Sequence, residues 1–245
     1  MRNSTSAHEN HGSTYMSPLE FSKTIDERLR RLADPQRAIT MRAYLLDQFA
    51  FLGLPAPVRR SAVKDLMAYP AQNAHQVLNL AAELWRLPER EFRYTAIDLL
   101  RQHVQLLRPT DLPAIKRLLL TDPWWETVDG LAAVVGAIVR VDPPLKLDDR
   151  TVMDDWVEDS SMWVRRVAML HQLGWRLDTD QRRLEAYALQ LASEGDFFIR
   201  KAIGWALRDY GRWHPAFVQD FVASHRAGLS SLTIREACRK LASAH

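Results

Sequence analysis

The chain has 245 residues, and its 33 Lys and Arg against 30 Asp and Glu give a formal net charge of +3. Hydrophobic residues make up 47% and charged residues 26%, which excludes a largely disordered chain and a collagen-like one. The single cysteine, Cys238, excludes an intramolecular disulfide, and no apolar run reaches the roughly 18–20 residues of a membrane span. We therefore expect a cytoplasmic protein with enough chain for a sizeable core.

The N-terminal residues are polar and rich in Ser, Asn and His, without the apolar core of a signal peptide. We expect a disordered tail over residues 1–16 and a single domain over residues 17–245. Met16 is a second candidate start of the protein.

From residue 21 onward the pattern is helical almost throughout, and strand-like alternation is scarce. Apolar residues recur at helical spacing in segments 21–32, 38–49, 77–85, 92–107, 128–139, 164–173, 184–191, 198–207 and 217–222. Breakers containing Pro or Gly separate them, at 34–35, 53–57, 69–70, 87–88, 108–109, 122–123, 142–144 and 214–215. Asp or Thr ahead of a first turn predicts helix starts at Thr110, Asp122, Asp142, Thr179 and Asp196. We expect about twelve short helices and no sheet.

Six alanines share one register along these helices. Ala62, Ala96, Ala132, Ala168, Ala202 and Ala237 are 34, 36, 36, 34 and 35 residues apart, and each lies near the middle of an expected helix. A period in the mid-thirties with two helices per repeat is typical of an α-solenoid of the HEAT or TPR type, and the TPR signature is absent. We predict an all-α fold, an α-solenoid of about six HEAT-like helical repeats that form a curved, concave surface.

Arginine outnumbers lysine by twenty-seven to six, and four arginines stand two residues before an alanine of the register: Arg60, Arg166, Arg200 and Arg235. A guanidinium group offers a planar pair of donors that suits phosphate. A row of them on the inner face of a solenoid would fit a nucleic-acid backbone. Alternatively, each arginine satisfies carbonyl groups and acids between neighbouring repeats. For a single arginine the two interpretations stand equal, and the row as a whole favours nucleic acid.

The usual catalytic templates are missing, because the chain has no phosphate-binding Gly loop, no His-Glu-x-x-His motif and no paired Cys ligands. We therefore expect no metal and no cofactor. The unusual feature is a Trp-rich run in which Trp125 and Asp129 are four residues apart and share a helix face. An indole and a carboxylate together suit a positively charged group. The alternative is that Trp124 or Trp125 packs between repeats while Asp129 caps a helix or pairs with an arginine.

A later segment adds candidates on one helix. Trp205 stands one turn after Lys201, and Arg208 stands a further turn on. Gly204 costs a helix about 1 kcal/mol relative to Ala, which indicates a close helix contact. The alternative for Trp205 is that it fills the core.

These segments resemble the AlkD family of DNA glycosylases, which are built from HEAT-like repeats. The pieces that carry the resemblance are residues 41–44, 48–53, 84–92, 124–129, 163–166, 197–208 and 232–237. They are ordered along the chain and spread over most of it, from about Tyr44 to Ala237.

The resemblance implies an enzyme that hydrolyses the N-glycosidic bond of cationic alkylated purines, such as N7-alkylguanine and N3-alkyladenine, in duplex DNA and leaves an abasic site. It implies that Asp129 is the catalytic carboxylate and that Trp125 and Trp205 flank the damaged nucleotide, with Tyr44 nearby. It also implies that Arg166 and Arg208 contact the DNA backbone. We expect duplex DNA as the partner, no membrane association and a monomer.

Two other functions are compatible with a helical solenoid. One is a non-catalytic HEAT-repeat protein that binds damaged or distorted DNA, and the other is a protein–protein scaffold. The presence of Trp125, Asp129, Arg166 and Trp205 together favours the enzyme.

Overall fold

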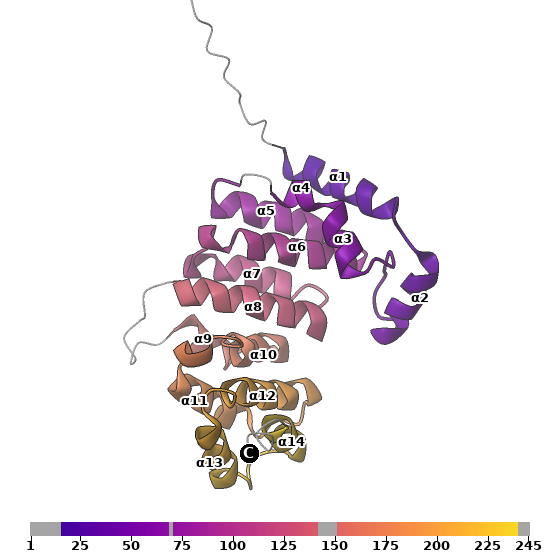
Figure 1. Ribbon diagram of the computed structural model, residues 1–245. Helices are drawn as coiled ribbons and strands as arrows, with labels where there is room; N and C mark the ends of the chain where they lie inside the picture. Colours follow the sequence, from indigo (N-terminus) through magenta and orange to yellow (C-terminus); the bar gives the residue numbers. More distant parts are fainter. Residues whose placement is uncertain (1–15, 69–70, 142–150, 240–245) are drawn as a thin grey trace, which may run out of the picture.

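The computed structural model describes residues 16–68, 71–141 and 151–239, and within these ranges the chain is helical (Figure 1). The described ranges contain fourteen α-helices and three short 3-10 helices, η1 Val104–Leu106, η2 Pro109–Asp111 and η3 Arg176–Asp178. One isolated parallel bridge joins Ala50 to Glu89, and no strand is formed in the described ranges. The prediction of an all-α fold is confirmed, while the expected tail over 1–16 lies outside the described residues except for Met16.

Six helices, one for each alanine of the register, form what we call the alanine row. Its members are α3 Ala56–Ala62, α6 Arg90–Gln102, α8 Trp125–Val141, α10 Met162–Leu170, α12 Phe197–Tyr210 and α14 Ser231–Cys238. Each member contacts the next along the chain. The remaining helices are α1 Pro18–Arg30, α2 Pro35–Tyr44, α4 Lys64–Met67, α5 Ala74–Trp85, α7 Leu112–Leu119, α9 Val152–Trp156, α11 Gln181–Leu191 and α13 Pro215–Ser224. The helices are stacked in chain order, as in a solenoid (Figure 1).

The predicted register is confirmed from Ala96 onward, where every alanine is at most 2% exposed. Ala62 differs, because it is the last residue of α3 rather than a middle one and is only half-buried. Two glycines bring neighbouring members of the row closer still. A Cβ atom added at Gly136 would lie 1.9 Å from the carbonyl oxygen of His171, and one added at Gly204 would lie 2.5 Å from the Cβ atom of Glu236. The close contact expected from Gly204 is therefore present, between α12 and α14.

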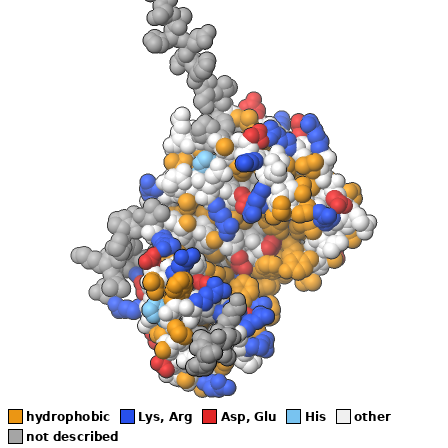
Figure 2. All heavy atoms as spheres, viewed as in Figure 1, with side chains coloured by type: hydrophobic (Ala, Val, Ile, Leu, Met, Phe, Trp, Pro, Cys, Tyr) orange, Lys and Arg blue, Asp and Glu red, His pale blue; other side chains and the backbone are white. Residues whose placement is uncertain are grey.

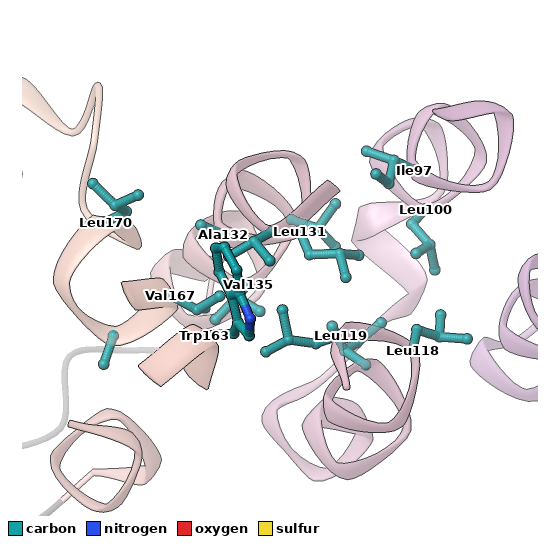
Figure 3. Packing of buried hydrophobic residues seen from close by; sticks show 14 of the residues in the cluster. Ile97, Leu100, Leu118, Leu119, Leu131, Ala132, Val135, Trp163, Val167 and Leu170 are labelled. Carbon is teal, nitrogen blue, oxygen red and sulfur yellow. The ribbon is translucent and has the colours of Figure 1, made fainter. Parts of the chain in front are cut away.

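The core runs through the stack from one repeat to the next. One buried cluster gathers Leu131 and Val135 of α8, Leu119 of α7, and Trp163 and Val167 of α10 (Figure 3). Each such side chain that leaves water contributes roughly 1.5–3 kcal/mol. This packing fixes how α8 and α10 face each other.

The structure has more helices than the roughly twelve expected, and some begin elsewhere. α4 has 4 residues and α9 has 5, too few for a 3.6-residue period to appear in the sequence. Asp196 caps α12 as predicted, by accepting from the backbone N–H groups of Phe198 and Ile199.

The other predicted helix starts differ from the observed ones or fall outside the described residues. The cap of α11 is Asp180 rather than Thr179, Thr110 lies inside η2, and Asp142 is outside the described residues. Asp122 does not cap α8, because its backbone turns into the left-handed region (φ 45°) three residues before that helix begins.

Candidate active site across the alanine row

Helix α8 carries the indole and the carboxylate that the sequence singled out. Trp125 is its first residue and Asp129 follows one turn later, so the two side chains lie on the same face. The opposite face is buried through Thr127, Leu131 and Val134. Trp125 is partly exposed and the Asp129 side chain is 24% exposed, so both can be reached from solvent.

Asp129 is held by the guanidinium of Arg166 on α10. Nε of Arg166 donates to Oδ1 of Asp129 and Nη2 donates to Oδ2, both at 2.8 Å, in a bidentate pair. Nη1 of Arg166 donates to the carbonyl oxygen of Phe198 at the start of α12. The Arg166 side chain is only 1% exposed, so it lies beneath the carboxylate rather than on the surface.

Burial raises the pKa of the Asp129 carboxyl above its ordinary value of 3.8, and the hydrogen bonds and charge of Arg166 oppose that shift. The carboxylate is thus poorly hydrated and bound on one side by a fixed cation. Its negative charge is positioned for a second cation that approaches from the exposed side.

Trp205 on α12 stands on the other side of Arg166. The guanidinium carbon of Arg166 lies 5.3 Å from the centre of the Trp205 ring, and the Lys201 ammonium lies 5.0 Å from the same ring. The indole Nε1 donates to Oε2 of Glu236 on α14 at 3.1 Å. Arg166 therefore joins Asp129 to Trp205 across three members of the alanine row.

Tyr44, the last residue of α2, reaches the site from far away in the sequence. Its side chain is 72% exposed, and its ring centre lies 5.9 Å from that of Trp125 at 78° in an edge-to-face contact. The helix expected to continue to Phe49 ends at Tyr44, because Leu46 and Asp47 have left-handed backbones (φ 57° and 56°). In Figure 2 the outline of the molecule is notched below α2, and hydrophobic side chains gather at the notch.

The segment that follows α2 is anchored by the buried carboxylate of Glu91. It accepts from the backbone N–H groups of Leu52, Gly53 and Leu54 at 2.9–3.1 Å. Gly53 is required there, since its φ is +87° and an added Cβ atom would lie 2.1 Å from the carbonyl oxygen of Asp34. No motif in the sequence pointed to Glu91.

Arg208 lies at the edge of the site. Its Nη1 donates to the Glu236 carboxylate and, at 3.1 Å, to the Glu236 carbonyl oxygen. With Trp205, Arg208 lines a cavity of about 180 Å³ that also borders Arg212, an exposed cation that the sequence analysis did not identify.

The arginine register does not form a uniform stripe. Arg166 is buried against Asp129, whereas Arg60 is exposed and pairs with Asp98 on the next member of the row. Arg200 donates to the carbonyl oxygen of Glu194 just before its own helix, and Arg235 is exposed. Arg60 and Arg166 thus satisfy acids between repeats, which was the alternative interpretation. The phosphate contact that the resemblance implies for Arg166 stays a prediction.

An aromatic cluster forms around Trp124, and the sequence predicted only that one of the two adjacent indoles would pack between repeats. Trp124 packs against Trp163 at 5.8 Å and Phe198 at 5.3 Å, measured between ring centres. Of the two adjacent indoles, Trp124 therefore packs between repeats while Trp125 stays at the surface with Asp129. The helical period predicts this difference, since Trp125 is one turn away from Asp129 whereas Trp124 is not.

In the described ranges, no group of three or more His, Cys, Asp or Glu residues is arranged to hold a metal ion. Nor does that part of the chain contain a helix long and apolar enough to cross a bilayer.

Comparison with known proteins assigns the chain to a family. The chain matches the model of the DNA alkylation repair enzyme family over residues 25–241. A solved structure described as a predicted DNA alkylation repair enzyme from Enterococcus faecalis is similar with a TM-score of 0.75 and 31% identity, covering 86% of this chain and 98% of that one. No curated protein matches in sequence.

The chain belongs to the DNA alkylation repair enzyme family, which confirms the resemblance. Membership gives it a role in the repair of alkylated DNA, with DNA as its partner.

Proposed function

We propose that the protein is a monofunctional DNA glycosylase that hydrolyses the N-glycosidic bond of cationic alkylated purines, N7-alkylguanine and N3-alkyladenine, in duplex DNA. The observation that carries the proposal is the Asp129 carboxylate, which is reachable from solvent, fixed by the buried Arg166 and one turn away from Trp125.

The chemistry of an alkylated purine fits such a site. Alkylation at N7 or N3 makes the base cationic, so it leaves as a neutral molecule once the bond from C1′ to the base nitrogen breaks with its electron pair going to the base. Positive charge then develops on the deoxyribose, as in other oxocarbenium-like transition states. Water adds to C1′ and loses its proton to the carboxylate or to solvent. A fixed carboxylate at the sugar stabilises the cation and orients the attacking water.

The aromatic side chains have a matching role in the proposal. Trp125 and Trp205 would flank the cationic nucleotide with their π-faces, and the exposed Tyr44 would contribute from the rim. Arg208 would contact the phosphate backbone from the edge of the site. For Arg166 the same contact would require a local rearrangement on DNA binding, because its side chain is 1% exposed and three of its N–H groups already bind Asp129 and Phe198.

The test is release of methylated bases from duplex DNA by the parent and by Asp129→Asn. We expect Asp129→Asn to bind duplex DNA nearly normally and to lose excision by at least about 100-fold, as when one electrostatic stabiliser of a transition state is removed. The readouts are the released base, identified after incubation with methylated duplex, and affinity in a gel shift.

Asp98→Asn is the matched control. Asp98 is also a partly exposed carboxylate held by arginines, at 2.7 Å from Arg59 and 2.9 Å from Arg60, but it lies outside the site. It should keep the parent rate. Equal base release by Asp129→Asn and the parent would defeat the catalytic assignment. DNA binding by the parent without any base release would favour a non-catalytic protein that binds damaged DNA.

A further inference from the structure

The last described helix, α14, is packed against α12 of the site, and none of the proposed substrate contacts lies on it. Gly204 of α12 allows this approach, because an added Cβ atom would lie 2.9 Å from the carbonyl oxygen of Thr233. Oγ1 of Thr233 in turn donates to the carbonyl oxygen of Arg200 at 3.1 Å. The position of α14 relative to α12 is therefore closely fixed.

Glu236 is the residue of α14 that reaches toward the site. Its Oε2 atom accepts from Nε1 of Trp205 at 3.1 Å and from Nη1 of Arg208. An indole has a single N–H donor, so this bond uses the only hydrogen-bonding group of the Trp205 side chain. Burial raises the pKa of Glu236, but the hydrogen bond and charge of Arg208 outweigh it and the pKa is lowered overall, so the acceptor stays ionised.

The Trp205 indole also contacts Arg166, and through Arg166 it is connected to the proposed catalytic carboxylate. Arg166 lies 5.3 Å from the Trp205 ring centre and pairs with Asp129 through two bonds of 2.8 Å. A shift of the indole would change the space beside Arg166, and Arg166 sets the position of Asp129. Small displacements of this kind are costly, since about 1 Å at a reacting group can lower a rate about 100-fold.

We propose that Glu236 is a positioning residue for excision: it fixes the Trp205 indole through the Nε1 hydrogen bond, and so completes from the C-terminal helix a site whose carboxylate lies three helices earlier in the alanine row. This inference rests on the proposed glycosylase function. It assigns no substrate contact to Glu236.

The experiment measures single-turnover release of N7-methylguanine from methylated duplex by the full chain, at a temperature at which circular dichroism shows every variant folded. Glu236→Ala should lower the maximal rate by roughly 10- to 100-fold and leave DNA affinity within a few fold. Glu236→Gln should retain most of the rate, because its amide oxygen can still accept from the indole. Should Glu236→Ala unfold, Glu236→Leu removes the acceptor while keeping the volume.

A double-mutant comparison separates positioning from simple stabilisation of the fold. Trp205→Phe lacks the N–H group, so adding Glu236→Ala to it should change the rate less than about threefold. Glu194→Ala is the matched control: it removes a carboxylate that binds Arg165 at 2.7 Å outside the site, and it should keep the parent rate.

The proposal is overturned if Glu236→Ala excises at the parent rate, if Glu236→Gln is as slow as Glu236→Ala, or if the loss persists undiminished in Trp205→Phe. These outcomes differ from failure of the proposed function, in which the parent itself releases no methylated base and the role of Glu236 fails with it.

Discussion

Arg166 and Asp129 depend on each other in a way that surface ion pairs do not. The guanidinium is almost completely enclosed, and two of its three hydrogen bonds go to the one carboxylate. Removing one partner of such a buried pair typically costs about 3–5 kcal/mol, because the other charge is left without compensation. Asp129 is therefore constrained by folding as well as by its proposed chemistry, and its substitution should be judged alongside a thermal unfolding measurement.

The raised pKa of Asp129 predicts how excision responds to acid. The proposed role requires the carboxylate, so activity is retained above the raised pKa and lost as the pH falls through it. The loss should begin at a higher pH than an ordinary aspartate, with its pKa of 3.8, would give. The measurement is single-turnover base release from about pH 8 down to about pH 4, after subtraction of spontaneous depurination. Asp98→Asn should show the same acid limb, and a rate independent of pH over this range would contradict the assignment.

At the scale of helices, the long members of the alanine row could be predicted because their buried face repeats every few residues over several turns. On this face, for example, Ala96 is fully buried and Ala132 almost fully buried. The end of α2 could not be predicted in this way, since apolar residues continue to Phe49 while the backbone reverses at Leu46 and Asp47. Left-handed backbone at non-glycine residues leaves little trace in a hydrophobic pattern.

Helix contacts in the row predict a ranking of three glycine-to-alanine substitutions. Gly136→Ala should destabilise most, because the added atom meets backbone at 1.9 Å, followed by Gly204→Ala at 2.5 Å from Glu236. Overpacking costs about 1–3 kcal/mol, more than the roughly 1 kcal/mol that alanine gains in a helix. Gly195→Ala is the control, since its nearest neighbour is the far end of Arg200 at 3.9 Å. Urea unfolding measures the order, and equal midpoints for all three would refute it.

At the scale of the molecule, the sequence predicted the members of the site better than their contacts. Trp125 and Asp129 could be paired because one helix carries both. The bond between Asp129 and Arg166 and the contact between Tyr44 and Trp125 join residues on different helices, so their geometry depends on how the repeats are stacked. The role of Glu236 depends on that stacking too, because Trp205 and its acceptor lie on different repeats.

The proposed DNA surface predicts a local dependence of affinity on salt. Arg212→Ala removes an exposed cation beside Arg208 and should lower the slope of log affinity against log salt concentration by about 1. Arg31→Ala is the matched control, because it removes an equal charge from an exposed side chain on the first turn after α1. It should leave the slope unchanged. If Arg166 also contacts a phosphate, its alanine variant will lower the slope by a similar amount. Equal slopes for Arg212→Ala and the parent would place the DNA elsewhere.

The carboxylate, its guanidinium and the indole beyond them belong to three consecutive members of the alanine row, α8, α10 and α12. Many repeat proteins tolerate the loss or gain of a unit, because each unit contacts only its neighbours. Here, excising or inserting a unit between α8 and α12 would give a chain that still stacks but in which Asp129 faces a different partner. The number of units between α8 and α12 is thus constrained by the proposed chemistry, and the contacts of Tyr44 with Trp125 and of Glu236 with Trp205 extend that constraint to α2 and α14.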